Sequence, residues 1–441
     1  GGILMSLGFA KETVRKGLAA HTALGLVCCA LLYLICATGT AIVLYEEWQR
    51  FEQRDAPEMT AIEPAAVQRG IENVLAVEND RATTTHLFVH MPTDALPRTT
   101  ITTDTQAFHV DADGTIVMPE ENAWSEFLLA LHYRLNLPAI YGMTLVGAFG
   151  AMIVALSISG IVAHPRIFRD AFRLRARRRD AVATVDWHNR LAVWTLPFAL
   201  AISLTGAMIG LFYVSGGIVA ETAYGGDSEA ALAPIFGEEA PQDPASAPVA
   251  DARPALAHMA RAYPEVEPYY VILHDPRTAG QHIQIVGEHP RRLIFGEYYA
   301  YGPDGEFHGT TGLADGTIGQ QLAASTYNLH FGNYGGLPVK IAYIAFGLAL
   351  TAVVATGTFI WLNKRARQGR PAPRTRAVWS GFVSGVPIAL VTTLLARLLI
   401  GNGAPFVALF WGTLALTVAV ALLRVRRDRE AASGPALAPA E

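Results

Sequence analysis

The stretch DWHNRLAVWTLPFALAISLTGAMIGL, residues 186–211, shows how this sequence is organised. It is a long apolar run with His188 near its entrance and a Thr-Gly pair near its far end. The first apolar run, HTALGLVCCALLYLICATGTAIVLY at residues 21–45, has the same order, with His21 at its entrance. In both runs the threonine of the Thr-Gly pair follows the histidine by 17 residues. Two runs with the same pattern predict a duplicated membrane-spanning unit.

The composition is typical of a membrane protein. The chain has 441 residues, of which 51% are hydrophobic and only 16% are charged, and these values fit a membrane protein better than a soluble one. The three cysteines, Cys28, Cys29 and Cys36, all lie in the first apolar run, which excludes a disulfide framework, a thiol zinc site and covalent haem attachment through Cys-x-x-Cys-His. The first run is too long for a cleaved signal peptide, so we expect a retained span.

Six apolar runs are long enough to cross a bilayer, since a helix rises about 1.5 Å per residue and the hydrocarbon layer is roughly 30 Å thick. We expect Pro197 to kink the third of them. The predicted segments, in order, are a basic N-terminal segment (1–20), span one (21–45), a first α+β domain (46–123), an outer helix with span two (124–164), a basic loop (165–187), span three (188–213), a second α+β domain (214–321), an outer segment with span four (322–363), a second basic loop (364–377), a hairpin of spans five and six (378–424) and a tail (425–441).

Basic residues define the predicted orientation. Lysine and arginine gather in the N-terminal segment, the two basic loops and the tail, and the first loop carries seven arginines. With six spans all four segments fall on one side, which the positive-inside rule makes cytoplasmic. The sequence therefore predicts a multi-pass membrane protein with both termini in the cytoplasm and both α+β domains outside, and the family resemblance described below implies the bacterial inner membrane.

The two large polar segments have the same internal order. Each contains a helical stretch, then alternating strand-like pieces, and then an Asp-Gly turn, at Asp113-Gly114 in the first and Asp304-Gly305 in the second. The Ala/Pro/Glu-rich start of the second segment, 226–251, is expected to be a loop. The predicted fold class is a mainly α polytopic membrane protein. It has a duplicated four-helix core, a C-terminal helical hairpin and two small periplasmic α+β domains.

Four histidines occupy repeat-related positions at the ends of the predicted spans. His21 and His188 lie at the cytoplasmic ends of spans one and three, and His132 and His330 at the outer ends of spans two and four. A parallel repeat places each histidine opposite its counterpart across a four-helix bundle. Two opposed imidazoles on rigid helices suit axial ligation of a b-type haem, so we expect two haems per chain and an electron path across the bilayer.

Other residues near these histidines leave alternatives open. Arg134 and Arg190 each follow a histidine by two residues and are candidate partners of haem propionates. His164 also lies at the cytoplasmic side, where it either replaces His21 or His188 as a ligand or caps span two. A single histidine at a membrane interface is usually a polar anchor, but four in repeat-related positions favour ligands, because intramembrane polar residues are costly and tend to be functional.

The histidines of the polar segments do not show a recognisable metal-ligand spacing. His86 and His90 share a strand face, which is compatible with a weak metal contact, but ordinary surface histidines are the favoured interpretation. The tyrosines of the predicted strands, such as Tyr269 and Tyr299, are interpreted as strand packing. The histidines in these segments are His86, His90, His109, His258, His274, His282, His289 and His308.

The apolar segments carry a family resemblance over roughly residues 15–365. The motif H…TG, in HTALGLVCCALLYLICATGT and DWHNRLAVWTLPFALAISLTGA, and the motif LH…G, in LHYRL and LHFGNYGGLPVKIAY, resemble the PepSY-associated transmembrane family, which includes PiuB-type iron-regulated inner-membrane proteins. The polar segments are similar to PepSY domains. The resemblance implies bis-histidine haem b and, less directly, reduction of periplasmic ferric siderophores or other ferric chelates.

The resemblance also bears on partners. Some relatives carry fused cytoplasmic flavin domains, but this sequence has no Rossmann glycine pattern, so a separate cytoplasmic donor or a quinol is expected to supply electrons. The lipid bilayer is the other expected partner, and nothing in the sequence suggests nucleic acid.

Two other functions compete with the electron-transfer hypothesis. One is a haem-free membrane protein whose PepSY-like domains bind or regulate a periplasmic protein. The other is a transporter that uses the histidines along its path. The absence of a mid-membrane histidine from the sequence argues against the transporter, because transport sites usually lie near the midplane.

Overall fold

The computed structural model describes the chain except for a few short segments, and these residues form two compact units. The described residues are 9–77, 84–171, 181–238, 240–291 and 293–432. Unit 1 comprises Gly1–Val43, Ala123–Gly210 and Ile341–Glu441, and unit 2 comprises Leu44–Asn122 and Leu211–Lys340. The predicted basic segments lie partly outside the described residues, at 1–8, 172–180 and 433–441.

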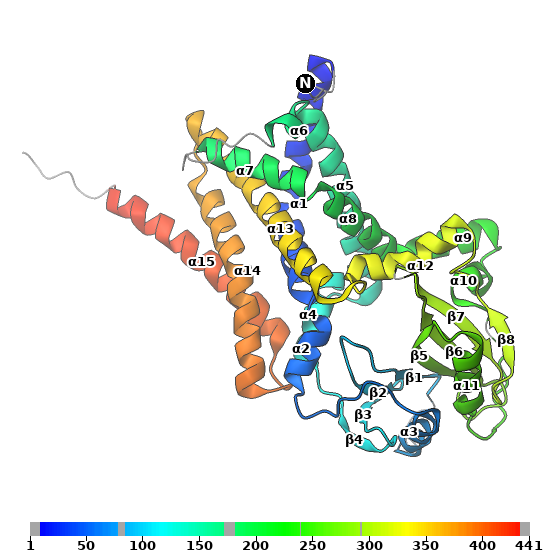
Figure 1. Ribbon diagram of the computed structural model, residues 1–441. Coiled ribbons are helices and arrows are strands. Elements are labelled where there is room, and N and C mark those ends of the chain that lie inside the picture. Colours follow the sequence, from blue (N-terminus) through cyan, green and yellow to red (C-terminus); the bar gives the residue numbers. More distant parts are fainter. Residues whose placement is uncertain (1–8, 78–83, 172–180, 239, 292, 433–441) are drawn as a thin grey trace, which may run out of the picture. The chain divides into compact units, whose positions relative to one another are not determined.

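Unit 1 is helical and contains the candidate membrane spans (Figure 1). Within the described residues, five helices are long and apolar enough to cross a membrane, and a bent pair, α7 and α8, is the sixth candidate. The chain is therefore a multi-pass membrane protein, and its apolar helices lie close to the predicted spans. The helices are α1 (Lys11–Ile42), α4 (Ala123–Arg134), α5 (Ala139–Ala163), α6 (Ile167–Asp170), α7 (Ala181–Trp194), α8 (Leu196–Gly210), α13 (Gly336–Arg367, which begins in unit 2), α14 (Pro373–Ile400) and α15 (Phe406–Ala432).

The third candidate span is bent rather than straight. Its two helices meet at 65° at a break beside Pro197. Proline has no N–H to donate to the preceding turn, and its ring clashes with that turn, so a break at this point is expected. The predicted kink is confirmed. His188 lies on α7 and the Thr-Gly pair on α8, and the crossing of the membrane by this bent pair as one span stays a prediction.

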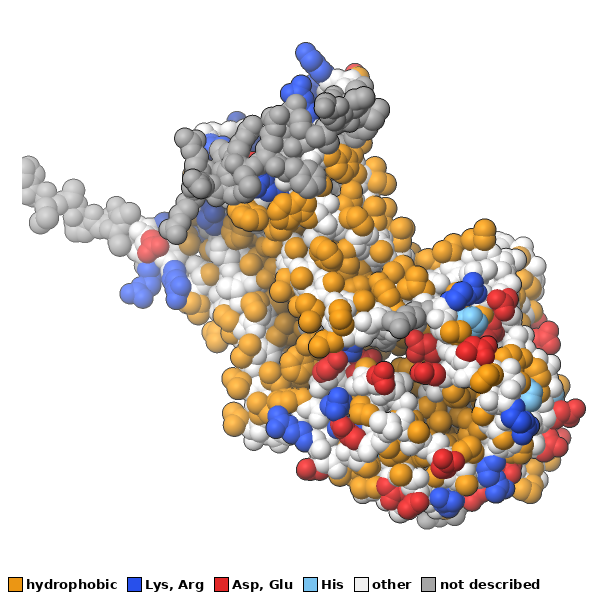
Figure 2. Space-filling view, viewed as in Figure 1, with side chains coloured by type: hydrophobic (Ala, Val, Ile, Leu, Met, Phe, Trp, Pro, Cys, Tyr) orange, Lys and Arg blue, Asp and Glu red, His pale blue; other side chains and the backbone are white. Residues whose placement is uncertain are grey.

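The C-terminal helices α14 and α15 form the predicted hairpin and pack closely against each other (Figure 1). A Cβ on Gly381 would come within 2.8 Å of the Cα of Val418, so the small residue is needed for this approach. The hairpin also holds α4, because the indole Nε1 of Trp124 donates a 3.1 Å hydrogen bond to Oγ1 of Thr393. Hydrophobic side chains cover the visible surface of these helices, as a lipid environment requires (Figure 2).

Unit 2 contains one antiparallel sheet of eight strands in the order β4-β3-β2-β1-β5-β6-β7-β8. The strands are β1 (His86–His90), β2 (Thr99–Thr102), β3 (Ala107–Val110), β4 (Ile116–Pro119), β5 (Glu267–His274), β6 (His282–Glu288), β7 (Phe295–Tyr301) and β8 (Phe307–Thr310). The helices are α2 (Tyr45–Glu52), α3 (Pro64–Val77), α9 (Phe212–Ala223), α10 (Ser228–Phe236), α11 (Ala252–Ala262) and α12 (Ile318–Phe331).

The two polar segments share this sheet instead of forming a separate sheet each. β1 from the first segment pairs with β5 from the second, with His86 opposite His274 and Val89 opposite Val271. Alternate residues of both strands, including Leu87 and Val271, are fully buried in one core with α3 and α11. The pairing joins residues far apart in the sequence, and local patterns do not specify such a contact.

Both predicted Asp-Gly turns connect neighbouring strands. Gly114 links β3 to β4 and Gly305 links β7 to β8, each with φ of 80°, a conformation that glycine adopts without a steric penalty. The loop expected at 226–251 was partly wrong, because it contains α10. The carboxylate of Asp227 caps this helix by accepting a 3.0 Å hydrogen bond from the amide of Ala230.

Candidate functional site

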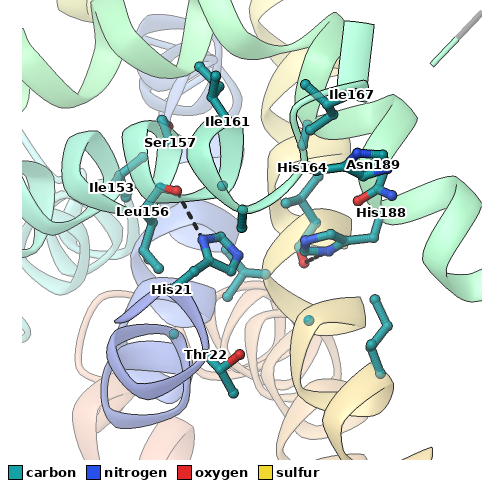
Figure 3. A pocket seen from close by; sticks show the side chains of 18 of the residues that line it. His21, Thr22, Ile153, Leu156, Ser157, Ile161, His164, Ile167, His188 and Asn189 are labelled. Carbon is teal, nitrogen blue, oxygen red and sulfur yellow. Dashed lines mark hydrogen bonds between the residues drawn. The ribbon is translucent and has the colours of Figure 1, made fainter. Parts of the chain in front are cut away.

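A cavity of about 390 Å³ lies inside unit 1, between α1, α5, α7 and α13 (Figure 3). Ligand pockets in proteins typically measure roughly 300–1,000 Å³ and are mostly apolar, with a few placed polar groups. Most of the lining is Leu, Ile, Val, Ala and Gly, and the polar exceptions are few. They include His21, Thr22, Ser157, His164, His188, Asn189, Thr195, Thr358 and Lys364.

The rings of His21 and His188 face each other across this cavity (Figure 3). Their ring centres are 6.4 Å apart and their planes make an angle of 79°. The two side chains come from α1 and α7, which carry residues far apart in the sequence. The structure therefore brings together the two histidines that the sequence predicted to be opposed at this end of the spans.

Three residues of α5 surround the ring of His21: Leu156, Ser159 and Gly160. Its Nδ1 donates a hydrogen bond of 3.0 Å to the carbonyl oxygen of Leu156, and the hydroxyl of Ser159 lies 3.3 Å from the same nitrogen. Because a carbonyl only accepts, Nδ1 carries the proton and the other nitrogen, Nε2, keeps its lone pair. A Cβ on Gly160 would come within 3.3 Å of the ring, so the glycine leaves room for it.

His188 is held in the same way by α13. Its Nδ1 donates to the carbonyl oxygen of Val353 at 3.0 Å and lies 3.2 Å from the hydroxyl of Thr356. A Cβ on Gly357 would be 3.4 Å from the ring. The carbonyl, the hydroxyl three residues later and the glycine four residues later form what we call a histidine niche. In both niches Nε2 is directed into the cavity (Figure 3).

His132, on α4, occupies a third niche, on α1. Its Nδ1 donates to the carbonyl of Ile35 at 3.1 Å and lies 3.4 Å from Oγ1 of Thr38. Gly39 follows, and a Cβ there would come within 2.7 Å of the ring, the tightest of the three contacts. This explains the Thr-Gly pair in the first apolar run: the hydroxyl and the missing side chain accommodate an imidazole.

A fourth segment of the same type lies on α8, where Ile202, Thr205 and Gly206 repeat the pattern. The hydroxyl of Thr205 donates to carbonyls of its own helix, including that of Ile202 at 3.2 Å. The remaining predicted ligand, His330, lies on α12 in unit 2, beside Phe331 with ring centres 5.6 Å apart.

The other predicted site residues are placed differently. His164 lines the cavity but lies beside Asn189 rather than between the two facing rings (Figure 3), and its backbone amide caps α5. Arg190 is not among the cavity-lining residues. It is buried, and its Nε and Nη2 have no hydrogen-bond partner among the residues that the structure describes. Residues two apart on a helix point in opposite directions, so Arg190 cannot share the direction of His188. Arg134 stacks over the ring of Tyr133 at 5.5 Å.

Sequence reasoning missed three residues of this site. Ser159 and Thr356 complete two niches, and Lys364 places a positive charge at the cavity. A signal for the first two was present, because Ser159-Gly160 and Thr356-Gly357 repeat the Thr-Gly pattern on the partner helices. Nothing in the local sequence indicates that Lys364 lines a cavity.

Unit 2 has a second group of histidines, arranged as a row across three strands. His86, His274 and His282 lie opposite one another on β1, β5 and β6. The rings of His274 and His282 are stacked, with centres 4.4 Å apart and planes at 6°. Burial, together with its two histidine neighbours, lowers the pKa of His274 to about 3. Among the described residues no three His, Cys, Asp or Glu side chains are grouped so that they could hold a metal ion.

The expectation that the histidines of unit 2 are surface residues was wrong for two of them, His109 and His274, which are buried. His109 is buried, lying 2.9 Å from the hydroxyl of Thr100 and 2.9 Å from Oε1 of Gln53. Burial lowers the pKa of His90 and of His109 to about 4. These groups are neutral, structural parts of the sheet at physiological pH.

Comparison with known proteins identifies relatives over most of this chain. The family model described as the PepSY-associated TM region matches residues 18–364. An uncharacterized protein of Pseudomonas aeruginosa is 27% identical over 292 residues, which cover 61% of this chain and 71% of the relative. The match to the family model includes all four histidines of the predicted pairs and ends before the hairpin of α14 and α15.

Proposed function

This chain belongs to the PepSY-associated transmembrane family, and we propose that it is an inner-membrane haem b protein that passes electrons across the membrane to a periplasmic ferric chelate. The observation that carries the proposal is the facing pair of His21 and His188, whose ring centres are 6.4 Å apart. The nitrogens of His21 and His188 would hold the iron of a haem.

The residues that line the cavity suit a haem, which would be held by two imidazoles in an apolar pocket. His21 and His188 each present Nε2 to the cavity, and the Nδ1 hydrogen bonds to Leu156 and Val353 fix the tautomer and the ring orientation. The apolar lining excludes water, and Lys364 supplies a cation for a propionate. When bound, a haem iron supplies a centre that alternates between the ferric and ferrous states. His132 and His330 form the second proposed pair on the basis of the sequence repeat.

The proposed substrate is a ferric siderophore or another ferric chelate on the periplasmic side. One electron converts its Fe(III) to Fe(II), which hard oxygen ligands bind less tightly, so the metal is released. The electron comes from a separate cytoplasmic donor or from a quinol. The orientation that this proposal needs, with both termini in the cytoplasm, is the one that the basic segments predict.

The proposal is tested in liposomes that contain the full chain with a membrane-impermeant reductant trapped inside. An external ferric hydroxamate chelate and a ferrous-specific dye report reduction on the outer side. We expect dye formation with the natural chain and none with His188→Ala at equal protein content. Equal reduction by both proteins would contradict the proposed path through this histidine pair.

A further inference from the structure

The helices α9 and α12 of unit 2 expose an unusual amount of apolar surface. α9 has the sequence FYVSGGIVAETA, whose only charged residue is Glu221. Its exposed side chains include Tyr213, Ile218 and Val219, with 56%, 58% and 44% of their surface accessible. Only Ala220 is buried, at 2%. A helix that is apolar all round is normally buried in a core or in lipid, yet this helix is exposed on nearly every side.

α12 has the opposite pattern of exposed and buried side chains to a helix in water. Its apolar Ile318 and Leu322, four residues apart and therefore on one face, are 78% and 60% exposed. Its polar Thr326 and Asn328 are buried, at 9% and 1%. A water-facing helix buries its apolar side chains and exposes its polar ones. Hydrophobic side chains are visible along the edge of unit 2 that α9 and α12 form (Figure 2).

Both helices are joined to membrane spans by very short connections. A single residue, Leu211, separates α9 from α8, and four residues separate α12 from α13. Since each residue extends the chain by at most about 3.6 Å, the start of α9 and the end of α12 stay close to the ends of candidate spans. A helix that crosses a bilayer has its ends near the bilayer surface.

We propose that α9 and the exposed face of α12 are membrane-contact elements, which seat unit 2 in the interfacial layer of the bilayer. The partner is the lipid itself, at the boundary between headgroups and acyl chains, where apolar helix faces are buried by roughly 5–10 Å. This membrane contact depends neither on haem nor on the reaction. It gives a role to α9, at the start of the second polar segment, and to α12, at its end.

The test uses nitroxide side chains on single cysteines of the full chain, in which Cys28, Cys29 and Cys36 are replaced by alanine. The labelled variants are Ile218→Cys on α9 and Leu322→Cys on α12, reconstituted in liposomes of phosphatidylethanolamine and phosphatidylglycerol. Leu398→Cys, on the exposed face of α14, is the lipid control, and Asp113→Cys, in the exposed turn between β3 and β4, is the water control. Collisions with oxygen and with a neutral nickel complex are measured by electron paramagnetic resonance.

We expect both new labels to match Leu398→Cys, with frequent collisions with oxygen and few with the nickel complex. Nickel access equal to that of Asp113→Cys would overturn the proposal, because the helices would then face water. Exclusion of both reagents would also overturn it, since that result indicates contact with another protein surface. Retention of the melting temperature of the unlabelled background shows that each variant is folded.

Discussion

Unit 1 and unit 2 each bring histidines together, but in different geometries. In unit 1, His21 and His188 face each other across an apolar cavity, and the Nδ1 of each is fixed by a backbone carbonyl. In unit 2, His274 stacks flat on His282 within a sheet. The stacked rings of unit 2 are 4.4 Å apart, whereas the rings of His21 and His188 are 6.4 Å apart, with the cavity between them. The group that fixes each imidazole ring, such as a backbone carbonyl that accepts from Nδ1, is therefore a better indicator of a ligand site than the number of histidines.

The largest expected effect separates the two groups by substitution. We predict that His188→Ala removes one of the two haems of the purified chain, because a single remaining imidazole does not hold the iron from both sides. His274→Ala, in the stacked row, is the matched control and keeps the natural haem content. Haem per chain is measured by the pyridine haemochrome method. Equal loss of haem in both variants would mean that the facing pair of unit 1 and the stacked row of unit 2 do not differ in haem binding.

The second effect concerns protons and belongs to unit 2. The pKa values of His90 and His109 near 4 and of His274 near 3 lie below the usual value of 6.5. Below pH 6.5 the unfolded chain binds protons that the folded sheet does not, so stability is fully present above that pH and falls as the pH drops towards 4, by at most about 1.4 kcal/mol per pH unit for each group.

Thermal unfolding followed by circular dichroism at pH 7, 6 and 5 checks this dependence. We expect His274→Gln to have a weaker decline of Tm between pH 6.5 and 5 than the natural chain. A decline of the same steepness in both proteins would mean that His274 does not contribute to acid sensitivity.

The third effect compares two niches of unit 1. Gly39→Ala places a methyl group 2.7 Å from the ring of His132, and Gly357→Ala places one 3.4 Å from the ring of His188. The first distance requires the ring to move, at a cost of roughly 1–3 kcal/mol. The second is an ordinary contact, and alanine favours the helix by about 1 kcal/mol over glycine.

We therefore expect Gly39→Ala to lower both the haem content and the Tm. Gly357→Ala should lower neither of them. Haem quantification and thermal unfolding of the two variants, prepared in parallel, provide the test. The opposite order of effects would mean that the glycines are required for helix packing rather than for the rings.

The smallest effect is expected from the niche hydroxyls. Thr356→Val keeps the shape of the side chain and removes a group 3.2 Å from Nδ1 of His188, while the carbonyl of Val353 continues to accept. The loss of one hydrogen bond is worth about 1 kcal/mol, so we predict slightly faster haem transfer to an apoprotein acceptor. Ser157→Ala, a hydroxyl lining the same cavity from α5, is the control and should leave the rate unchanged.

Local sequence patterns predicted much of this fold because they act within a few residues. Apolar runs long enough to cross a bilayer marked the spans, Pro197 marked the bend, and Asp113-Gly114 and Asp304-Gly305 marked two turns. The pairing of β1 with β5 was not predictable, because strand alternation shows which residues face the core but not which strand is the neighbour.

Part of the candidate site was also predictable from the sequence, and part of it was not. The facing of His21 and His188 followed from the repeat in the sequence, and the structure brings these rings together. The roles of Ser159 and Thr356 did not follow, because a Ser/Thr-Gly pair on a helix also serves helix packing. The role of Arg190 at a propionate stays a prediction, and its side chain does not line the cavity.

The most direct test of the central claim is the visible absorption spectrum of the detergent-purified chain, oxidised and dithionite-reduced, after expression with adequate haem. We predict the sharp bands of six-coordinate low-spin haem b in the reduced protein, with two haems per chain. A colourless protein with full helical content by circular dichroism would contradict the account, and His21 and His188 would then be only polar residues that join membrane helices.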